Sequence, residues 1–523
     1  MTDICLVFPR NPDNRALSPT LAGAESMGLG YLASVLREHN FNVKIINAEQ
    51  MSISNYDIID IILNENPKIV GFSPVAVNMQ EVINVAKVIK ERNSSIHITM
   101  GGHHVSFVCS EILEEEECID TIILGEGEYT LLNLANYVIN NIGNMLEIDG
   151  LCYRKGTKVI IGKHQIIEDI DKLPMPSRDT LNEIILMQQR KEARIITSRG
   201  CIGNCSFCTT PKFYNRTWRG RNYIKVLDEI SYLVSTYKIE YLWITDDSFI
   251  VNTFESQKRA EMICNEIINR KLNVKFRILC RADSFNSSYR LIPLLKKAGL
   301  DSIFIGFESG DDEILKGYNK GITTKENKKI IEELVENEIK IQIGFIMFSP
   351  YSTLESLRNN ILFLREIQEL YRFFPLTRTL DIFPGTSIYL KLLEDKLIIK
   401  DFSYKSNRKY DYSYKNPNIE RIFNIIDICY DNKTDWLDKQ LLQIKFVSIP
   451  QLLQKNGFSE MKRIENIYFE INEINYLFFS AIIENINMIS EDYYITYNEK
   501  RKEQIENKIF EINTIMGDRK DDA

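Results

Sequence analysis

The chain of 523 residues lacks three features that would each point to a particular class of protein. It has no excess of positive charge: 64 lysines and arginines stand against 72 acidic residues, which argues against nonspecific binding to nucleic acid. No uncharged apolar run reaches the length of a membrane-spanning helix. The first residues lack the basic segment and apolar stretch of a secretory signal peptide. We therefore expect a cytoplasmic protein that binds neither nucleic acid nor a membrane.

The cysteines of the chain cluster in one short segment only. Of the ten cysteines, Cys201, Cys205 and Cys208 stand together with three and two residues between them. The next two, Cys264 and Cys280, lie far along the chain in segments with apolar periodicity, so no fourth cysteine is near. In a large chain without a secretion signal, such a cluster fits reduced thiols at a metal site better than disulfides.

Three thiolates on one loop can ligate three irons of a cubane cluster and leave the fourth iron open, whereas most such clusters have four cysteine ligands. A zinc knuckle, which needs a fourth ligand, and three buried thiols are the alternatives. The motif, with the aromatic Phe207 before the third cysteine, resembles the signature of the radical S-adenosylmethionine (SAM) superfamily. The resemblance implies a [4Fe-4S] cluster on Cys201, Cys205 and Cys208, with SAM at the open iron beside Phe207.

Residues 1–145 alternate apolar strands with amphipathic helices, a pattern that predicts a doubly wound parallel sheet of the Rossmann or flavodoxin type. Ligands bind such sheets beyond the carboxyl ends of the strands. The loops predicted at those ends contain Ser73, Gly101-Gly102-His103 and Gly125-Glu126-Gly127, whose glycines permit close approach of the backbone to a bulky ligand. The first strand is not followed by G-x-G-x-x-G, which argues against a dinucleotide.

Placed ahead of the three cysteines, these loops resemble the cobalamin-binding domain of cobalamin-dependent radical SAM enzymes. The resemblance implies cobalamin contacts for six residues: Ser73, Gly101, Gly102, His103, Gly125 and Gly127. The loop at residues 11–16 departs from the family pattern because it has no histidine to ligate cobalt from below. We therefore expect cobalamin without a protein imidazole beneath cobalt. A flavodoxin-like domain without a ligand is the alternative, with His103 as an ordinary solvated residue.

Three further regions follow along the chain. Residues 146–190 contain a predicted hairpin and then a proline-containing extended segment, so we place a linker there. Residues 191–400 repeat strand–helix units and predict a partial (β/α)6 TIM barrel, the radical SAM domain, whose chemistry lies at the carboxyl ends of its strands. Residues 401–523 show helical periodicity without a ligand motif, and we expect a helical C-terminal domain that shapes the substrate pocket.

Polar side chains follow several of the predicted barrel strands: Asp246, Asp247, Arg281, Glu308 and Ser309. By resemblance to the superfamily, Asp246 or Asp247 accepts a hydrogen bond from the SAM ammonium, and Glu308 and Ser309 contact the ribose. A guanidinium pairs naturally with a carboxylate, so Arg281 is our candidate for the SAM carboxylate. For each residue, a strand-end ion pair or a helix cap is the alternative.

The combined resemblance implies a cobalamin-dependent radical SAM methyltransferase. It would methylate an unactivated carbon of a small-molecule or natural-product intermediate by way of a 5′-deoxyadenosyl radical and methylcobalamin. No catalytic residue beyond the cofactors is expected, and the electron donor would be a flavodoxin or ferredoxin. A peptide is the second choice of substrate. The alternatives are a radical SAM cyclase or ring-contracting enzyme in which cobalamin transfers no methyl group, and a cobalamin and iron–sulfur sensor without turnover.

Overall fold

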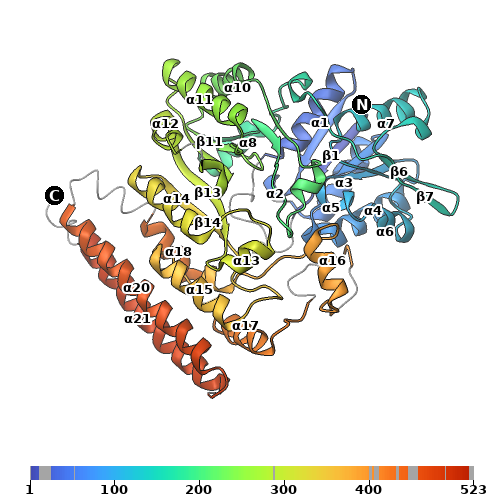
Figure 1. The fold of residues 1–523 in the computed structure, drawn as a ribbon. Coiled ribbons are helices and arrows are strands. Elements are labelled where there is room, and N and C mark those ends of the chain that lie inside the picture. The colour runs from blue at the N-terminus through green and yellow to red at the C-terminus, as the bar shows by residue number, and fades with distance from the viewer. Residues whose placement is uncertain are drawn as a thin grey trace.

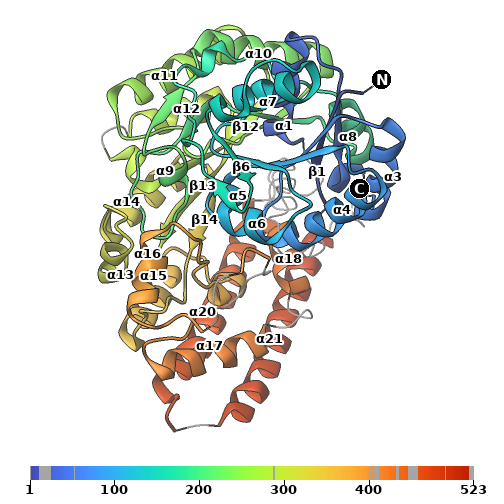
Figure 2. The same cartoon turned by 90° about the vertical axis from the view of Figure 1, so that its right-hand side faces the viewer.

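The computed structural model in Figures 1 and 2 places two α/β units next to each other and a long helical hairpin beside the second unit. It describes residues 2–10, 25–51, 53–286, 289–399, 403–405, 412–430, 435–445, 458–488 and 490–517. The predicted cobalt-facing loop at residues 11–16 lies outside the described residues, so the expectation of cobalamin without a protein imidazole stays a prediction.

The first unit is a seven-stranded sheet with the strand order β2-β1-β3-β4-β5-β6-β7. Its first five strands are parallel: β1 (Ile4–Phe8), β2 (Val43–Asn47), β3 (Ile69–Phe72), β4 (His97–Gly101) and β5 (Thr121–Ile123). Seven helices accompany them: α1 (Met27–Glu38), α2 (Ala48–Met51), α3 (Asn55–Glu65), α4 (Met79–Arg92), α5 (His103–Ser106), α6 (Cys109–Glu115) and α7 (Glu128–Asn140).

Alternation along the strands explains why helices cover both faces of this sheet. Ile4 and Leu6 of β1 belong to the core that includes α1 and α7, whereas Cys5 and Val7 belong to the core that includes α3, α4 and α6. Successive side chains of a strand point to opposite faces, so a strand covered on both sides is apolar throughout. The doubly wound sheet predicted from the sequence is confirmed.

A hairpin extends the first sheet at one edge. Strands β6 (Leu151–Lys155) and β7 (Lys158–Ile160) are antiparallel to each other, and β6 is antiparallel to β5. Our sequence analysis assigned these residues to the linker, whereas the structure adds them to the first sheet. The sequence predicts the hairpin from its turn, but the pairing of Cys152 with Ile122 is a tertiary contact that the hairpin sequence does not encode.

The second unit is a partial barrel of five parallel strands in the order β14-β13-β12-β11-β8. Its strands are β8 (Glu192–Ile195), β11 (Tyr241–Ile244), β12 (Lys275–Arg281), β13 (Leu300–Glu308) and β14 (Lys340–Phe345). Its helices are α8 (Leu181–Gln188), α10 (Tyr223–Tyr237), α11 (Phe254–Asn269), α12 (Leu291–Ala298), α13 (Asp312–Gly317), α14 (Thr324–Glu336), α15 (Leu354–Glu366) and α16 (Ser387–Glu394). The predicted sixth strand is reduced to a single parallel bridge between Phe348 and Thr379.

Within the described residues, the C-terminal region is helical, as predicted. It consists of α17 (Pro417–Cys429), α18 (Asp435–Gln443), α20 (Phe458–Asn485) and α21 (Glu491–Gly517). The last two form the long hairpin in Figure 1. Buried amides attach α20 to the barrel: Asn472 accepts from the backbone N–H of Leu370 at 2.7 Å, and Asn475 donates to the Leu370 carbonyl at 2.5 Å.

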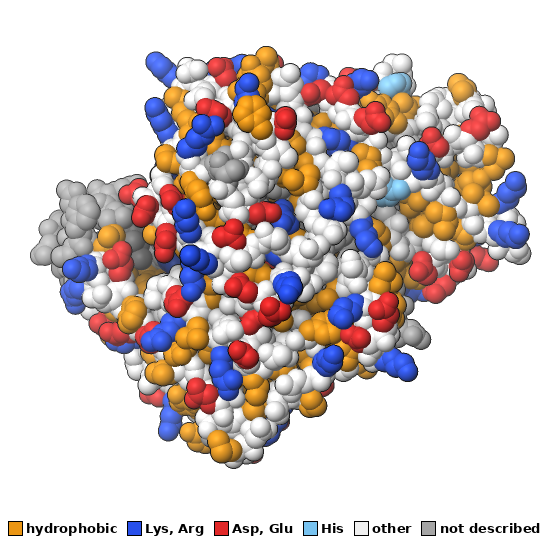
Figure 3. Space-filling model, viewed as in Figure 1, with side chains coloured by type: hydrophobic (Ala, Val, Ile, Leu, Met, Phe, Trp, Pro, Cys, Tyr) orange, Lys and Arg blue, Asp and Glu red, His pale blue; other side chains and the backbone are white. Residues whose placement is uncertain are grey.

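The surface carries charges of both signs. Among the described residues, no helix combines the length and the apolar character needed to cross a bilayer. On the face in Figure 3, acidic and basic side chains are interspersed over both α/β units.

Candidate active site between the two sheets

The cysteine loop, residues 201–208, begins directly after β9 (Ser198–Gly200), which pairs with β10 (Trp218–Gly220) beyond the carboxyl end of β8. Contacts on its outer side hold it in place. The backbone N–H of Ser206 donates to the Tyr318 carbonyl at 2.8 Å, and that of Ile388 donates to the Ser206 carbonyl at 3.0 Å. The Phe207 ring meets the Tyr318 ring edge-on at 5.2 Å between centroids.

The three thiols of this loop lie close enough to influence one another. Burial raises the pKa of Cys208 to about 11, and the charges of Cys205 and Cys201 contribute to the rise. The pKa of Cys201 is raised as well, chiefly by burial. A bound metal ion has the opposite effect and lowers the pKa of these thiols, because a coordinated thiol is deprotonated.

The donor set fits an iron–sulfur cluster. Soft thiolates suit iron–sulfur clusters, and the backbone N–H of Gly203 donates to Cys201 Sγ at 3.3 Å, a contact that tunes such sites. Within the described ranges, no three Cys, His, Asp or Glu side chains converge as a single metal ion requires. A cubane instead offers a separate iron to each thiolate, so convergence on one point is not needed.

Arg281, at the end of β12, packs against the inside of the cysteine loop. Its Nε and Nη2 donate to the two carboxylate oxygens of Asp283 at 2.8 and 2.9 Å, and its Nη1 donates to Cys205 Sγ at 2.9 Å. A Cβ on Gly203 would lie 2.4 Å from Nη1, so only glycine permits this approach. Burial lowers the pKa of Arg281, but Asp283 and the neighbouring thiols raise it further, to above its usual value. A role toward the SAM carboxylate stays a prediction.

Two adjacent carboxylates after β11 have different surroundings. Asp246 is buried and accepts three hydrogen bonds, from Thr197 N at 2.6 Å, Thr197 Oγ1 at 2.5 Å and Ser198 Oγ at 2.7 Å. Asp247 accepts from the backbone N–H of Gly200 at 3.1 Å, and its side chain is accessible to solvent. Burial raises the pKa of both carboxyl groups. Asp247 is thus the accessible member of the predicted pair.

The two residues at the end of β13 are both engaged in side-chain contacts. Glu308 Oε1 accepts from Lys320 Nζ at 2.8 Å in a largely buried ion pair. A Cβ on Gly306 would lie 2.2 Å from this oxygen, so glycine makes room for the pair. Ser309 is buried and donates to Asn360 Oδ1 at 2.7 Å. The ribose contacts predicted for Glu308 and Ser309 stay predictions.

Sequence reasoning missed Lys320 as a site residue. Burial lowers the pKa of Lys320, but the charges of Glu308 and Cys205 raise it above its usual value, so the ammonium stays charged next to the cysteine loop. Its backbone carbonyl also accepts from Arg281 Nη2 at 2.7 Å. The only sequence signal was a lysine in the loop after α13, close in sequence to the strand that ends in Glu308.

The first sheet contributes loops to the same region. Helix α5 packs beside α9 (Thr210–Phe213), which follows the cysteine loop directly. The His103 ring stacks on the Phe213 ring at 3.8 Å between centroids, and Gly102 adopts a left-handed φ of 112° beside the Ser73 hydroxyl. Burial lowers the pKa of His103 to about 4, although part of its side chain is accessible to solvent. Ser73, Gly101, Gly102 and His103 are thus brought together.

The last of these loops, Gly125–Glu128, joins the two units. Gly125 has a φ of 82°, and a Cβ there would lie 2.1 Å from the Gln165 carbonyl. Glu126 lies between the two glycines of this loop and Glu128 follows the second. Both accept hydrogen bonds from Arg199 in β9, at 2.8 and 2.7 Å. The predicted cobalamin contacts of Gly125 and Gly127 stay predictions. Sequence reasoning missed these ion pairs because their partners are more than 70 residues apart.

The carboxyl-end loops of the two sheets therefore meet where α5 packs beside α9, and the first sheet contributes glycines and a neutral imidazole there. Such a lining fits a bulky ligand that needs close backbone approach. The second sheet contributes three thiols and several charged groups. Together these features describe a partial barrel with three clustered thiols that faces a ligand-binding α/β domain.

Comparison with known proteins identifies both units. Residues 23–135 match the B12 binding domain family, and residues 195–364 match the Radical SAM superfamily. The chain is 30% identical over 379 residues to an uncharacterized methyltransferase of Pyrococcus horikoshii, covering 71% of this chain and 79% of that protein. It is 29% identical over 358 residues to the anaerobic magnesium-protoporphyrin IX monomethyl ester cyclase of Rubrivivax gelatinosus. This match covers 66% of this chain and 63% of that protein.

The fold also matches a solved structure along nearly the whole chain. The cobalamin-dependent S-adenosylmethionine radical enzyme OxsB with aqua-cobalamin bound superposes with a TM-score of 0.73 at 21% identity, covering 99% of this chain and 79% of OxsB. The chain belongs to the cobalamin-dependent radical SAM enzymes, as the resemblance of its motifs indicated. Its cofactors are SAM, a [4Fe-4S] cluster and cobalamin.

Proposed function

We propose that the protein methylates an unactivated carbon of a small organic molecule bound between the two sheets. The observation that supports this most directly is the contact between the loops assigned to the two cofactors. The His103 ring of the B12-binding domain lies 3.8 Å from the Phe213 ring, only five residues beyond Cys208. A substrate bound beside this contact would be within reach of both cofactors.

In this proposal the bound cofactors supply a carbon-centred radical and a methyl group, and the protein positions the reactants. Cys201, Cys205 and Cys208 would hold the cluster, and Asp247, the accessible carboxylate, would accept from the SAM ammonium. The Glu308–Lys320 ion pair would lie beside the ribose.

The stoichiometry follows from the chemistry. For each methyl group transferred, one SAM becomes S-adenosylhomocysteine. A second SAM is cleaved to methionine and 5′-deoxyadenosine, which carries the hydrogen removed from the substrate. Two electrons come from an external donor, for which we propose a flavodoxin or ferredoxin. A peptide is the second candidate for the substrate.

A cyclase or rearranging activity is the second candidate function. It is favoured by the similarity to the anaerobic magnesium-protoporphyrin IX monomethyl ester cyclase. Such an enzyme would also cleave SAM to 5′-deoxyadenosine, but no methyl group would reach the product.

The two functions can be separated with SAM that carries a deuterated methyl group. The reconstituted protein, a low-potential reductant and fractions of small molecules or peptides are analysed by mass spectrometry, with Cys208→Ala as the control. Methylation predicts equal amounts of 5′-deoxyadenosine and S-adenosylhomocysteine and one labelled methyl per product. A product without label, formed with 5′-deoxyadenosine alone, would support the cyclase, and the absence of 5′-deoxyadenosine would support a sensor.

A further inference from the structure

A buried ion network joins the Gly125–Glu128 loop to the cysteine loop. Arg199, two residues before Cys201, donates Nη1 to Glu126 at 2.8 Å and Nη2 to Glu128 at 2.7 Å. None of these three side chains is more than 9% exposed. One guanidinium therefore holds both carboxylates that flank Gly127.

Additional contacts fix the orientation of this network. The Arg199 guanidinium lies over the Tyr31 ring at 4.9 Å, and Arg219 in β10 donates to the second oxygen of Glu126 at 2.6 Å. That oxygen also accepts from the backbone N–H of Ile167 at 2.6 Å. The two arginines hold the pKa of Glu126 below its usual value although burial opposes this, so the carboxylate stays charged.

Stability alone is a weak explanation for such a network. Replacing a buried ion pair with well-packed apolar residues is often neutral or stabilising, because burying charge is costly. The planar guanidinium instead fixes the orientation of the two carboxylates, because its donors define both the distance and the angle to each of them. A fork of this kind suits a function that depends on alignment.

We propose that Arg199 is a positioning residue that fixes the distance between the cluster and cobalamin. The inference rests on the proposed function, in which both cofactors act on one substrate. Arg199 is linked to Cys201 through Gly200 alone, and Glu126 stands between two glycines predicted to contact cobalamin. A change in the angle between the domains would separate the loops. A misplacement of about 1 Å can cost roughly 100-fold in rate.

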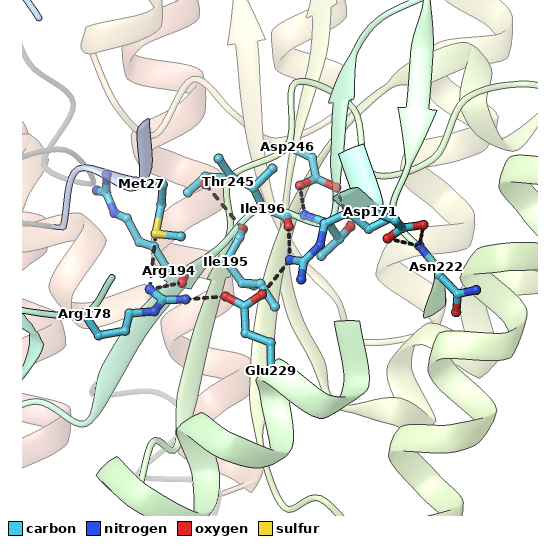
Figure 4. Close-up of polar contacts among 12 residues, drawn as sticks. Met27, Asp171, Arg178, Arg194, Ile195, Ile196, Asn222, Glu229, Thr245 and Asp246 are labelled. Carbon is cyan, nitrogen blue, oxygen red and sulfur yellow. Dashed lines mark hydrogen bonds and ion pairs between the residues drawn. The ribbon is translucent and has the colours of Figure 1, made fainter. Parts of the chain in front are cut away.

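A second buried arginine provides a matched control. Arg178 also joins the two units, with Nη1 2.9 Å from Glu25, and its side chain is only 4% exposed. Its Nη2 lies 2.5 Å from Glu229 (Figure 4). Glu25 lies just before α1 and Glu229 lies in α10, so neither partner belongs to a cofactor loop. Both arginines are buried and pair with two glutamates, but only Arg199 holds a loop that is predicted to contact a cofactor.

The test measures the magnetic interaction between the cofactors in the full-length reconstituted protein. A nearby reduced cluster speeds the electron-spin relaxation of Co(II) in cobalamin, which raises the microwave power needed to saturate its EPR signal. We expect Arg199→Lys and Arg199→Met to retain iron and cobalamin while their half-saturation power falls toward that of a cluster-free triple cysteine variant. Arg178→Lys should lose thermal stability but keep the wild-type half-saturation power.

Wild-type relaxation in both Arg199 variants, or an equal change in Arg178→Lys, would overturn the proposal. Arg199→Lys keeps the charge, so it remains informative if Arg199→Met fails to fold. Failure of the proposed function looks different: the wild-type protein would then bind only one cofactor or form no methylated product, whatever residue stands at position 199.

Discussion

The carboxyl ends of the two parallel sheets meet in one region, but they are built differently. The first sheet ends in glycines and an uncharged imidazole, and its charged side chains there, Glu126 and Glu128, are paired with Arg199. Crowding restricts the residue type at Gly125, and a positive φ restricts it at Gly102. The barrel ends in thiols and in ion pairs such as Arg281–Asp283 and Glu308–Lys320. One end is therefore suited to a bulky ligand through shape, and the other to polar cofactors through charge. The predictions below test this division.

The largest effect is expected at the barrel end, where the thiols hold the cluster. Replacing Cys201, Cys205 and Cys208 with alanine should abolish iron binding and reduce 5′-deoxyadenosine formation to background, because no other ligands are available in the loop. Cobalamin binding should persist, since the first sheet receives cobalamin through shape. Iron, sulfide and cobalamin analyses check this prediction. Loss of cobalamin together with iron would contradict the view that the two ends bind their cofactors independently.

Lys320→Met should have the next largest effect, because it leaves the Glu308 carboxylate largely buried without its partner. Breaking a buried ion pair in this way typically costs about 3–5 kcal/mol. The double variant Lys320→Met/Glu308→Gln should recover much of the loss in chemical denaturation. If the double variant is no more stable than the single one, charge does not dominate at this end.

Gly125→Ala should damage the first sheet through shape. The residue has a φ of 82°, and the added Cβ would lie 2.1 Å from the Gln165 carbonyl, so we expect a loss of about 2–4 kcal/mol and of cobalamin binding. Gly143→Ala is the matched control, since Gly143 has a φ of 91° but open space around it, and should cost about 1 kcal/mol. Equal losses would show that backbone strain, not crowding, matters at Gly125.

The smallest effect concerns pH. The pKa of His103 is lowered from 6.5 to about 4 in the folded protein, chiefly by burial. Between these values the unfolded state binds the proton and the folded state does not, so stability should fall as the pH is lowered through this window. His103→Phe keeps an aromatic ring on Phe213 and should reduce the loss of Tm between about pH 7 and about pH 5. An unchanged pH dependence would contradict an imidazole that stays neutral in the folded protein.

The sequence was most informative where chemistry restricts residue types. The three cysteines predicted the radical SAM barrel, and strand–helix alternation predicted both sheets. It could not separate Asp246 from Asp247, because adjacent identical residues differ only in what surrounds them after folding. It also could not pair Arg199 with Glu126, since long-range ion pairs depend on how the two units pack.

The central claim is that one chain brings a [4Fe-4S] cluster and cobalamin to the region where the carboxyl ends of its two sheets meet. The most direct test is anaerobic purification followed by quantification of iron, sulfide and cobalamin, for the wild type and for the triple alanine variant at Cys201, Cys205 and Cys208. The account predicts about four irons and about one cobalamin per wild-type chain, and cobalamin without iron in the variant. Cobalamin without an iron–sulfur cluster in the wild type would contradict it.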